Sequence, residues 1–356
     1  MNLERPRTLW RSALLVAVLV LTASGCGSDS GGERLSAGAA SEPVTVRLGY
    51  FPNITHAPAL VGVQKGFFAE KLGANKLETK AFNAGPEAVE AIFAGTLDIA
   101  YIGPNPAINA FQKSNGEAIR IVSGCTSGGA YLVTRPEITT AADLKGKTVA
   151  SPQLGNTQDV ALRSWLKENG LTADVSGGGD VHIKPQENAD TLNALKSGEI
   201  AGAWVPEPWA TRLIQEAGAK VLVDERTLWP EGRYVTTLIV VAKKFLDAHP
   251  DVVKQVLEGH LAALDFIAAD PTGAQKLANK EIEAVTGKPL QDKVIAAAWP
   301  NLEFTSDPIA SSLQKSVSDA KAAGLLKSDD VSGIYDLSIL NQLLVDKGQP
   351  AIAGRT

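Results

Sequence analysis

Reactive side chains are scarce in this sequence of 356 residues. It contains two cysteines and four histidines, and the histidines stand far apart, at positions 56, 182, 249 and 260. A metal site built on histidine would therefore be hard to assemble. The Gly-x-Ser-x-Gly elbow, the His-Glu-x-x-His motif, paired cysteines and a complete Walker A pattern are all missing from the sequence. We therefore expect neither an enzyme nor a protein with a metal or another cofactor.

An excess of positive charge is missing as well. The net charge is −5 at pH 7, and acidic and basic residues are mixed along the chain. Because proteins that bind nucleic acid need a basic patch, we expect no nucleic acid as a partner. The hydrophobic fraction of 44% is ordinary for a globular protein. The length of the chain suggests about two domains.

The first 25 residues have the features of a lipoprotein signal peptide. Arg5, Arg7 and Arg11 precede the apolar run 13–21, which is too short to span a bilayer. Residues 23–26, Ala-Ser-Gly-Cys, resemble a bacterial lipobox, although leucine is commoner than alanine three places before the cysteine. We expect Cys26 to be lipidated and to anchor the protein to the extracytoplasmic face of the cell membrane. A plain secretory signal is the alternative.

Residues 26–43 are rich in glycine and serine and nearly free of bulky apolar residues, so they predict a flexible tether. In the mature chain Cys125 would be the remaining free thiol, which excludes an intramolecular disulfide. The apolar segment 119–122 just before it favours a buried, inert thiol over a reactive one.

From residue 44 onward the patterns of strand and helix alternate. Strands are expected at 44–50, 77–82, 98–102, 118–122, 130–134, 147–150, 181–184, 200–204, 220–223 and 234–241, and helices at 57–72, 86–94, 104–113, 157–169, 189–197 and 208–217. Beyond residue 241 the pattern is almost wholly helical. This order predicts an α/β fold in which mainly parallel sheets are covered by helices, arranged as two lobes that the chain connects twice.

Four turns lie between the end of a predicted strand and the start of a helix, where open α/β sheets bind their ligands. The candidate ligand-binding residues in them are Tyr50, Phe51, Asn53 and His56 in the first turn, Gly85 in the second, Asn105 in the third, and Gly155, Asn156, Thr157 and Gln158 in the fourth. Turn chemistry alone also uses glycine, proline and asparagine, so a structural role stays open for each turn. For His56 a structural hydrogen bond is an alternative to a role as a base.

The fourth turn, residues 151–161, is suited to an anion. The first amides of a helix have no partner within the helix and lie at the positive end of its dipole. Gly155 would let a ligand approach the backbone, and Asn156, Thr157 and Gln158 offer uncharged donors. An ordinary helix N-cap is the alternative interpretation.

A fifth segment, Trp204-Val205-Pro206-Glu207-Pro208-Trp209, offers two indoles and a carboxylate between prolines. Trp204 and Glu207 could form a rigid wall against an organic group. Alternatively, Glu207 caps the following helix and the indoles belong to the core.

Five segments together resemble a known family. They are Gly49-Tyr50-Phe51 and residues 61–68, 95–100, 143–150 and 204–208, and they are similar to the substrate-binding proteins of nitrate, sulfonate and taurine ABC importers, most of all to aliphatic sulfonate-binding proteins. The resemblance implies a periplasmic binding protein fold of type II, in which two α/β lobes joined by two crossovers enclose a ligand cleft. Lobe I would comprise residues 44–129 and 234–356, and lobe II residues 130–233.

The resemblance also implies a function. A monomer would capture an aliphatic sulfonate by closure of its lobes and deliver this small organic anion to the permease and ATPase subunits of an importer. Asn105 and the segment 155–158 would hold the anion, and Tyr50, Phe51 and Trp204 its organic part. Nitrate, taurine and a pyrimidine-like thiamine precursor remain alternative ligands. An enzyme related to thiamine pyrimidine synthase is a further alternative, but the chain lacks the cysteine-rich motif of those enzymes.

Overall fold

The structure is a computed structural model that describes residues 42–354. Residues Met1–Glu42 and Pro43–Thr356 form separate units, and the second unit is described here by itself. The predicted signal peptide, the lipidation of Cys26 and the tether up to residue 41 lie outside the described residues. Within residues 42–354, no helix is long and apolar enough to cross a membrane.

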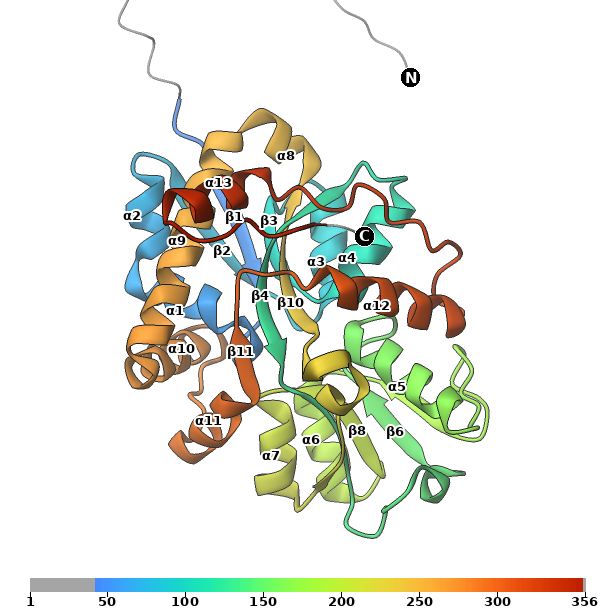
Figure 1. The fold of residues 1–356 in the computed structure, drawn as a ribbon. Coiled ribbons are helices and arrows are strands. Elements are labelled where there is room, and N and C mark those ends of the chain that lie inside the picture. The colour runs from blue at the N-terminus through green and yellow to red at the C-terminus, as the bar shows by residue number, and fades with distance from the viewer. Residues whose placement is uncertain (1–41, 355–356) are drawn as a thin grey trace, which may run out of the picture. The chain divides into compact units, whose positions relative to one another are not determined.

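Six strands form the first sheet, in the order β11-β4-β10-β3-β1-β2 (Figure 1). Their bounds are Thr45–Tyr50 for β1, Lys76–Ala81 for β2, Ile99–Ile102 for β3, Ile119–Gly128 for β4, Val235–Ala242 for β10 and Leu302–Phe304 for β11. Strand β1 pairs in parallel with β2 and β3. Strand β10 runs antiparallel to both β3 and β4. We use the name lobe I for this sheet and the helices packed on it.

Five strands form the second sheet, in the order β7-β6-β8-β5-β9. Their bounds are Ala130–Thr134 for β5, Thr148–Ser151 for β6, His182–Pro185 for β7, Gly202–Pro206 for β8 and Lys220–Asp224 for β9. Strand β6 is parallel to β7 and β8, whereas β5 is antiparallel to β8 and β9. We use the name lobe II for this sheet and its helices.

The prediction of mainly parallel sheets is wrong. Five of the nine strand pairings within residues 42–354 are antiparallel. The reason is the double connection between the lobes. The chain passes from β4 through Gly128 and Gly129 directly into β5, and it returns from β9 into β10. Each crossover therefore brings a strand that runs against the parallel strands of the sheet it enters. Gly128 and Gly129 have φ of 78° and 72°, a left-handed conformation that favours glycine.

Helices cover both faces of the lobe I sheet (Figure 1). One face carries α1 (Ala57–Lys65), α2 (Phe67–Leu72), α9 (Pro250–Ala269), α10 (Pro271–Thr286) and α13 (Ser338–Asp346), and the other α3 (Gly85–Phe93), α4 (Pro104–Lys113) and α12 (Ala310–Ala322). Two shorter helices are α8 (Lys243–Ala248) and α11 (Asp292–Ala298). The single helix predicted over 57–72 is broken at Gly66, whose φ of 80° ends α1.

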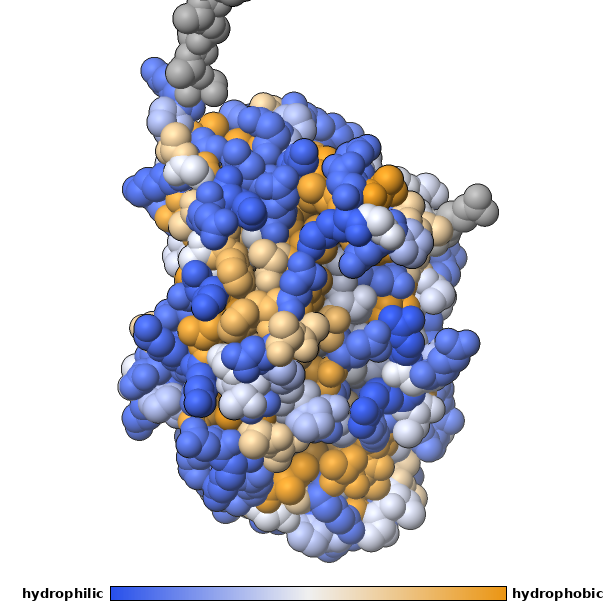
Figure 2. Space-filling model, turned by 60° about the vertical axis from the view of Figure 1, so that its left-hand side comes forward, coloured by the Kyte–Doolittle hydropathy of each residue, from blue (hydrophilic) through white to orange (hydrophobic). Residues whose placement is uncertain are grey.

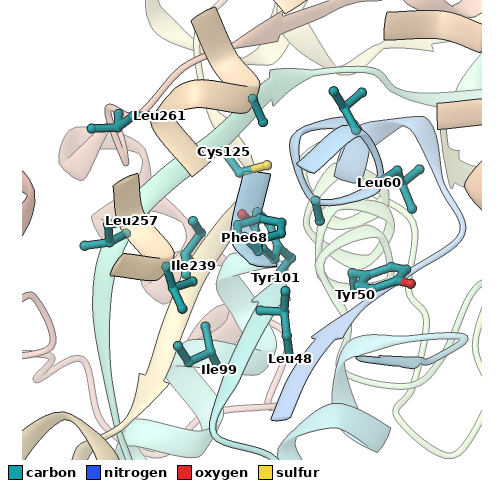
Figure 3. Close-up of a cluster of buried hydrophobic side chains, with 14 of the residues drawn as sticks. Leu48, Tyr50, Leu60, Phe68, Ile99, Tyr101, Cys125, Ile239, Leu257 and Leu261 are labelled. Carbon is teal, nitrogen blue, oxygen red and sulfur yellow. The ribbon is translucent and has the colours of Figure 1, made fainter. Parts of the chain in front are cut away.

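The main core of lobe I lies between its sheet and the α1, α2, α9 and α10 layer. Figure 3 shows Leu48, Ile99 and Ile239 of the sheet together with Leu60, Phe68, Leu257 and Leu261 of the helices. Burial of one such side chain stabilises the fold by roughly 1.5–3 kcal/mol relative to its exposure to water. Cys125 belongs to this core, and its burial raises the pKa of the thiol to about 12. The expectation of a buried thiol at Cys125 is confirmed.

Lobe II repeats this layering on a smaller scale. Helix α5 (Thr157–Glu168) packs on one face of its sheet, and α6 (Asn188–Ser197) and α7 (Trp209–Ala217) pack on the other.

On the molecular face in Figure 2, hydrophilic side chains separate the apolar ones into patches.

Candidate functional site

A cavity of about 30 Å³ is lined by turns from both lobes. Lobe I contributes residues from the turns 51–56, 83–85 and 103–106, and Thr236 and Thr237 at the start of β10. Lobe II contributes Pro152, Asn156, Thr157, Gln158, Asn188 and Pro206. A volume of this size has room for about two water molecules. The cavity is therefore narrow, with the lobes close together around it.

The lining turns follow the carboxyl ends of equivalent strands in the two lobes. In lobe I they follow β1, β2 and β3, and in lobe II they follow β6, β7 and β8. Gly103 of lobe I lies so close to Thr157 of lobe II that a Cβ atom at this glycine would be 2.3 Å from the threonine Oγ1. A side chain at position 103 would therefore force Thr157 or the lobes themselves to shift.

The N-terminus of α5 forms the lobe II side of the cavity. Asn156 is the N-cap, and its Oδ1 accepts a hydrogen bond of 2.9 Å from the amide of Asp159. Thr157 is 7% exposed, and its Oγ1 has no hydrogen-bond partner among the described residues. This buried hydroxyl therefore lies at the positive end of a helix dipole with its donor unused.

Two further polar side chains of the cavity are also unpaired. Neither Asn188 Oδ1 at the start of α6 nor Thr237 Oγ1 in β10 finds a partner within the described part of the chain. Asn188 is 8% and Thr237 1% exposed. A buried polar group without a partner costs about 1–3 kcal/mol. Three such groups around one cavity indicate a site for a polar guest.

The lobe I side of the cavity is neutral. Burial lowers the pKa of His56 to about 3, so its imidazole is uncharged at pH 7. Its Nδ1 accepts a hydrogen bond of 3.3 Å from the amide of Phe51, so the proton is on Nε2. Asn53 Oδ1 accepts a hydrogen bond of 2.9 Å from the indole nitrogen of Trp209 in lobe II. Among the described residues that line the cavity, none is Asp, Glu, Lys or Arg.

Seven of the twelve predicted ligand-binding residues line the cavity: Phe51, Asn53, His56, Gly85, Asn156, Thr157 and Gln158. The other five do not. Tyr50 lies in the lobe I core (Figure 3), where its hydroxyl is hydrogen-bonded to Glu281. Trp204 is fully buried in the lobe II core, and its indole nitrogen donates to Glu225 Oε2 at 2.7 Å. Both rings therefore pack in the protein interior.

The remaining three have partners inside the protein. Asn105 donates from Nδ2 to the carbonyl of Ser316 at 3.2 Å. The amide of Gly155 donates to Asp159 Oδ2 at 2.9 Å. Glu207 accepts from the amide and hydroxyl of Thr211 at 3.0 and 2.8 Å, which makes it a cap of α7, and burial raises the pKa of its carboxyl. Glu207 therefore caps a helix, which was the alternative to a ligand-binding role in the sequence analysis.

Ten lining residues were not among the twelve predicted. Seven of them lie in segments that the sequence singled out or directly beside a predicted residue: Thr55, Asn83, Ala84, Gly103, Pro106, Pro152 and Pro206. The other three, Asn188, Thr236 and Thr237, lie in segments that the sequence did not single out. Asn188 follows β7 at the start of α6, in the same position relative to its strand as the predicted turns. Its position between a predicted strand and a predicted helix could therefore have indicated Asn188 as a candidate. Thr236 and Thr237 lie inside a run of β-formers, which predicts a strand and gives no sign of a cavity.

Comparison with known proteins identifies the family. Residues 39–282 match the NMT1-like family. The chain belongs to this family. Over 232 residues it is 29% identical to the taurine-binding periplasmic protein of Escherichia coli, covering 65% of this chain and 69% of that protein. Over 267 residues it is 27% identical to a putative binding protein of Brucella abortus, covering 71% of this chain and 79% of that protein.

Solved structures of binding proteins have the same fold as this NMT1-like protein. The alkanesulfonate-binding protein SsuA of Xanthomonas axonopodis pv. citri, bound to MOPS, matches with a TM-score of 0.68 at 21% identity, over 82% of this chain and 96% of that one. The nitrate-binding protein NrtA of Synechocystis matches with a TM-score of 0.70 at 16% identity, over 86% and 89%. The predicted α/β class and two-lobed binding-protein fold are confirmed. The relatives and neighbours named here are binding proteins, not enzymes.

Proposed function

We propose that this chain is the extracytoplasmic solute-binding component of an ABC importer, and that it captures a short aliphatic sulfonate and delivers it to the permease. Membership of the NMT1-like family and similarity to taurine-, nitrate- and sulfonate-binding proteins support the proposal. Cys26 and the tether 26–43 would hold the monomer at the outer face of the membrane. Residues 44–129 with 234–356 and residues 130–233 would be the two moving lobes.

The observation that carries the proposal is the lining of the cavity, which has no charged side chain among the described residues and has buried polar atoms without hydrogen-bond partners. Thr157, Asn188 and Thr237 leave polar atoms unpaired, and the N-terminus of α5 supplies a partial positive charge. The hydroxyls of Thr157 and Thr237 can donate hydrogen bonds, and neutral donors together with a helix dipole suit a single negative charge. The unpaired atom of Asn188 is Oδ1, which can only accept a hydrogen bond from the guest. Phe51 and the prolines 106, 152 and 206 give the same cavity apolar walls, which suit the methyl or ethyl group of a short sulfonate.

Closure of the lobes would enclose this guest. Besides the Trp209–Asn53 hydrogen bond, Asn83 Nδ2 of lobe I donates to Glu187 Oε1 of lobe II at 2.9 Å. A ligand that touches both lobes stabilises the closed arrangement over the open one, and this differential affinity drives closure. Opening at the permease would then release it.

Nitrate is a second candidate, and two observations favour it. The cavity is small, at about 30 Å³. In addition, Tyr50 and Trp204, which the sequence suggested as walls for an organic group, lie in the lobe cores. A planar monoanion could use the same neutral donors without an apolar wall.

A thermal-shift and calorimetry panel tests the proposal. The chain lacking residues 1–26 is titrated with methanesulfonate, ethanesulfonate, taurine, nitrate, sulfate and a pyrimidine. A ligand at a hundred times its dissociation constant should stabilise the protein by about 2.7 kcal/mol. We expect the short sulfonates to give the largest shift. Stabilisation by nitrate alone would identify nitrate as the ligand. Stabilisation by the pyrimidine alone would overturn the proposal that the cavity binds an anion.

A further inference from the structure

A buried carboxylate lies directly behind the α5 side of the cavity. Asp159 is fully buried, in the first turn of α5. Its Oδ1 accepts a hydrogen bond of 2.8 Å from the hydroxyl of Ser151, and its Oδ2 one of 2.9 Å from the amide of Gly155. Asp159 therefore ties the end of β6 and the turn that follows it to the start of the helix.

Asp159 is paired with a buried arginine. Arg163 Nε donates to Asp159 Oδ2 at 2.9 Å, and Nη2 donates to Oδ1 at 3.3 Å. Arg163 is 4% exposed, and its Nη1 also donates to the carbonyl of Asp174 at 2.8 Å. The pair satisfies both buried charges, as burial of charge requires.

The order of the two charges along α5 sets the field at the cavity. Arg163 is four residues after Asp159, one helical turn further from the N-terminus. The cavity-lining residues Asn156, Thr157 and Gln158 come before both. The carboxylate of Asp159 contacts Ser151 and Gly155, which are the chain neighbours of the lining residues Pro152 and Asn156. The other partners of Arg163 are the carbonyls of Ala173 and Asp174, which do not line the cavity. The negative member of the pair is therefore the nearer one, and it opposes part of the positive field of the helix end.

We propose that Asp159 both positions the turn that binds the anion and restricts the site to guests with a single negative charge. This inference rests on the proposed function. The nearby carboxylate repels the second charge of a dianion, while Arg163 lies behind it. The carboxylate also accepts from the amide of Gly155, so this amide is not free for the guest, whereas the hydroxyl of Thr157 has no partner among the described residues.

Two observations separate this role from simple helix capping. The N-cap function is already performed by Asn156. The site itself does not depend on the helix end alone, because the unpaired Thr157 hydroxyl, 7% exposed, lines the same cavity. Asp159 thus acts on the guest through the turn and through its charge, as a positioning residue.

The test compares a monoanion and a dianion of similar shape. Dissociation constants of methanesulfonate and sulfate are measured by calorimetry for the wild type and Asp159→Asn, and their ratio is the readout. The variant leaves the charge of Arg163 unbalanced behind the turn, so we expect the preference for methanesulfonate over sulfate to fall at least tenfold. A merely structural role would weaken both anions alike and leave the ratio unchanged, which would overturn the proposal.

A double variant covers the case in which Asp159→Asn does not fold. Asp159→Asn combined with Arg163→Gln removes both buried charges, and we expect the preference for methanesulfonate to fall about threefold or more. A folded double variant with the wild-type ratio also overturns the inference. Binding of neither anion by the wild type is a different result, because it overturns the proposed anion site itself.

Discussion

In lobe I, β1 lies between β2 and β3, and β10 runs antiparallel beside β3. In lobe II, β6 lies between β7 and β8, and β5 runs antiparallel beside β8. The two lobes thus share one strand pattern, and their turns reach the cavity from equivalent strand ends. What differs is the chemistry of those turns.

Most polar groups of lobe I at the cavity already have partners. His56 accepts from Phe51, Asn53 accepts from Trp209, and the Thr236 hydroxyl donates to the carbonyl of Gly128 at 2.6 Å. Thr237 is the exception. Both lobes present helix N-termini to the cavity, those of α3 and α4 in lobe I and those of α5 and α6 in lobe II. Lobe II differs in that the first residue of α5, Thr157, has an unpaired hydroxyl. We therefore propose that lobe II donates to the anion through Thr157 and that lobe I closes over it.

The largest expected effect concerns pH, where buried groups of the two lobes act in opposite directions. Burial lowers the pKa of His56 and of His260, both in lobe I, to about 3. Below about pH 6.5 these histidines gain protons only in the unfolded chain. Folding stability should therefore fall by up to about 1.4 kcal/mol per pH unit for each histidine as the pH drops.

Glu225 of lobe II has the opposite effect. Burial raises the pKa of its carboxyl to about 7, so the folded protein keeps a proton that the unfolded chain loses above about pH 4.5. Its contribution to stability is present at low pH and is lost as the pH rises towards 7. Between pH 5 and 6.5, Glu225→Gln should steepen the acid loss of unfolding free energy by about 1.4 kcal/mol per pH unit. Urea titrations at several pH values measure this, and parallel curves for variant and wild type would contradict it.

The next effect tests the division of roles directly. Thr157→Val keeps the shape of the side chain and removes the unpaired donor of lobe II. Loss of a hydrogen bond to a charged group costs about 1.5–3 kcal/mol, so the dissociation constant of the bound anion should rise by roughly ten- to a hundredfold. Thr237→Val, the matched change in lobe I, should cost less because Thr237 belongs to strand β10 and not to the first turn of a helix.

Thr211→Val is the control for this pair. Thr211 is buried at the start of α7, and it contacts Glu207 rather than the cavity. It should lower stability without a change in anion affinity. Equal losses of affinity from Thr157→Val and Thr237→Val would show that the lobes contribute alike.

A smaller effect is expected at the Trp209–Asn53 hydrogen bond between the lobes. Trp209→Phe keeps an aromatic ring and removes the indole donor. Since a neutral hydrogen bond contributes about 0.5–1.5 kcal/mol, ligand release should become roughly two- to tenfold faster. Stopped-flow fluorescence or surface plasmon resonance measures the rate. An unchanged release rate would mean that this bond persists when the lobes part.

The sequence predicted the elements that depend on local pattern. Strands β1 to β10 were expected within a few residues of their ends, except that β4 continues to Gly128, because alternating and apolar runs are local signals. Strand β11 was missed because it has three residues and exists through pairing with the distant β4. The helix break at Gly66 was missed because glycine within a helical pattern is also tolerated.

For the cavity, strand ends were predictable but side-chain directions were not. Tyr50 ends β1 and Phe51 follows it, so their side chains point to opposite sides. The sequence does not say which side faces the other lobe, and the structure places Tyr50 in the core and Phe51 in the cavity lining. Thr237 reaches the cavity only because the return strand enters lobe I there, a consequence of topology.

The smallest effect is expected at the second contact between the lobes, Asn83 with Glu187. This bond lies at the surface, where water competes for both groups, so its contribution is at most about 1 kcal/mol. Glu187→Ala should accelerate ligand release less than Trp209→Phe does, by no more than about fivefold. The same kinetic measurement compares the two variants. A larger effect from Glu187→Ala would mean that the exposed contact holds the lobes together, and the half-buried indole would then only pack against lobe I.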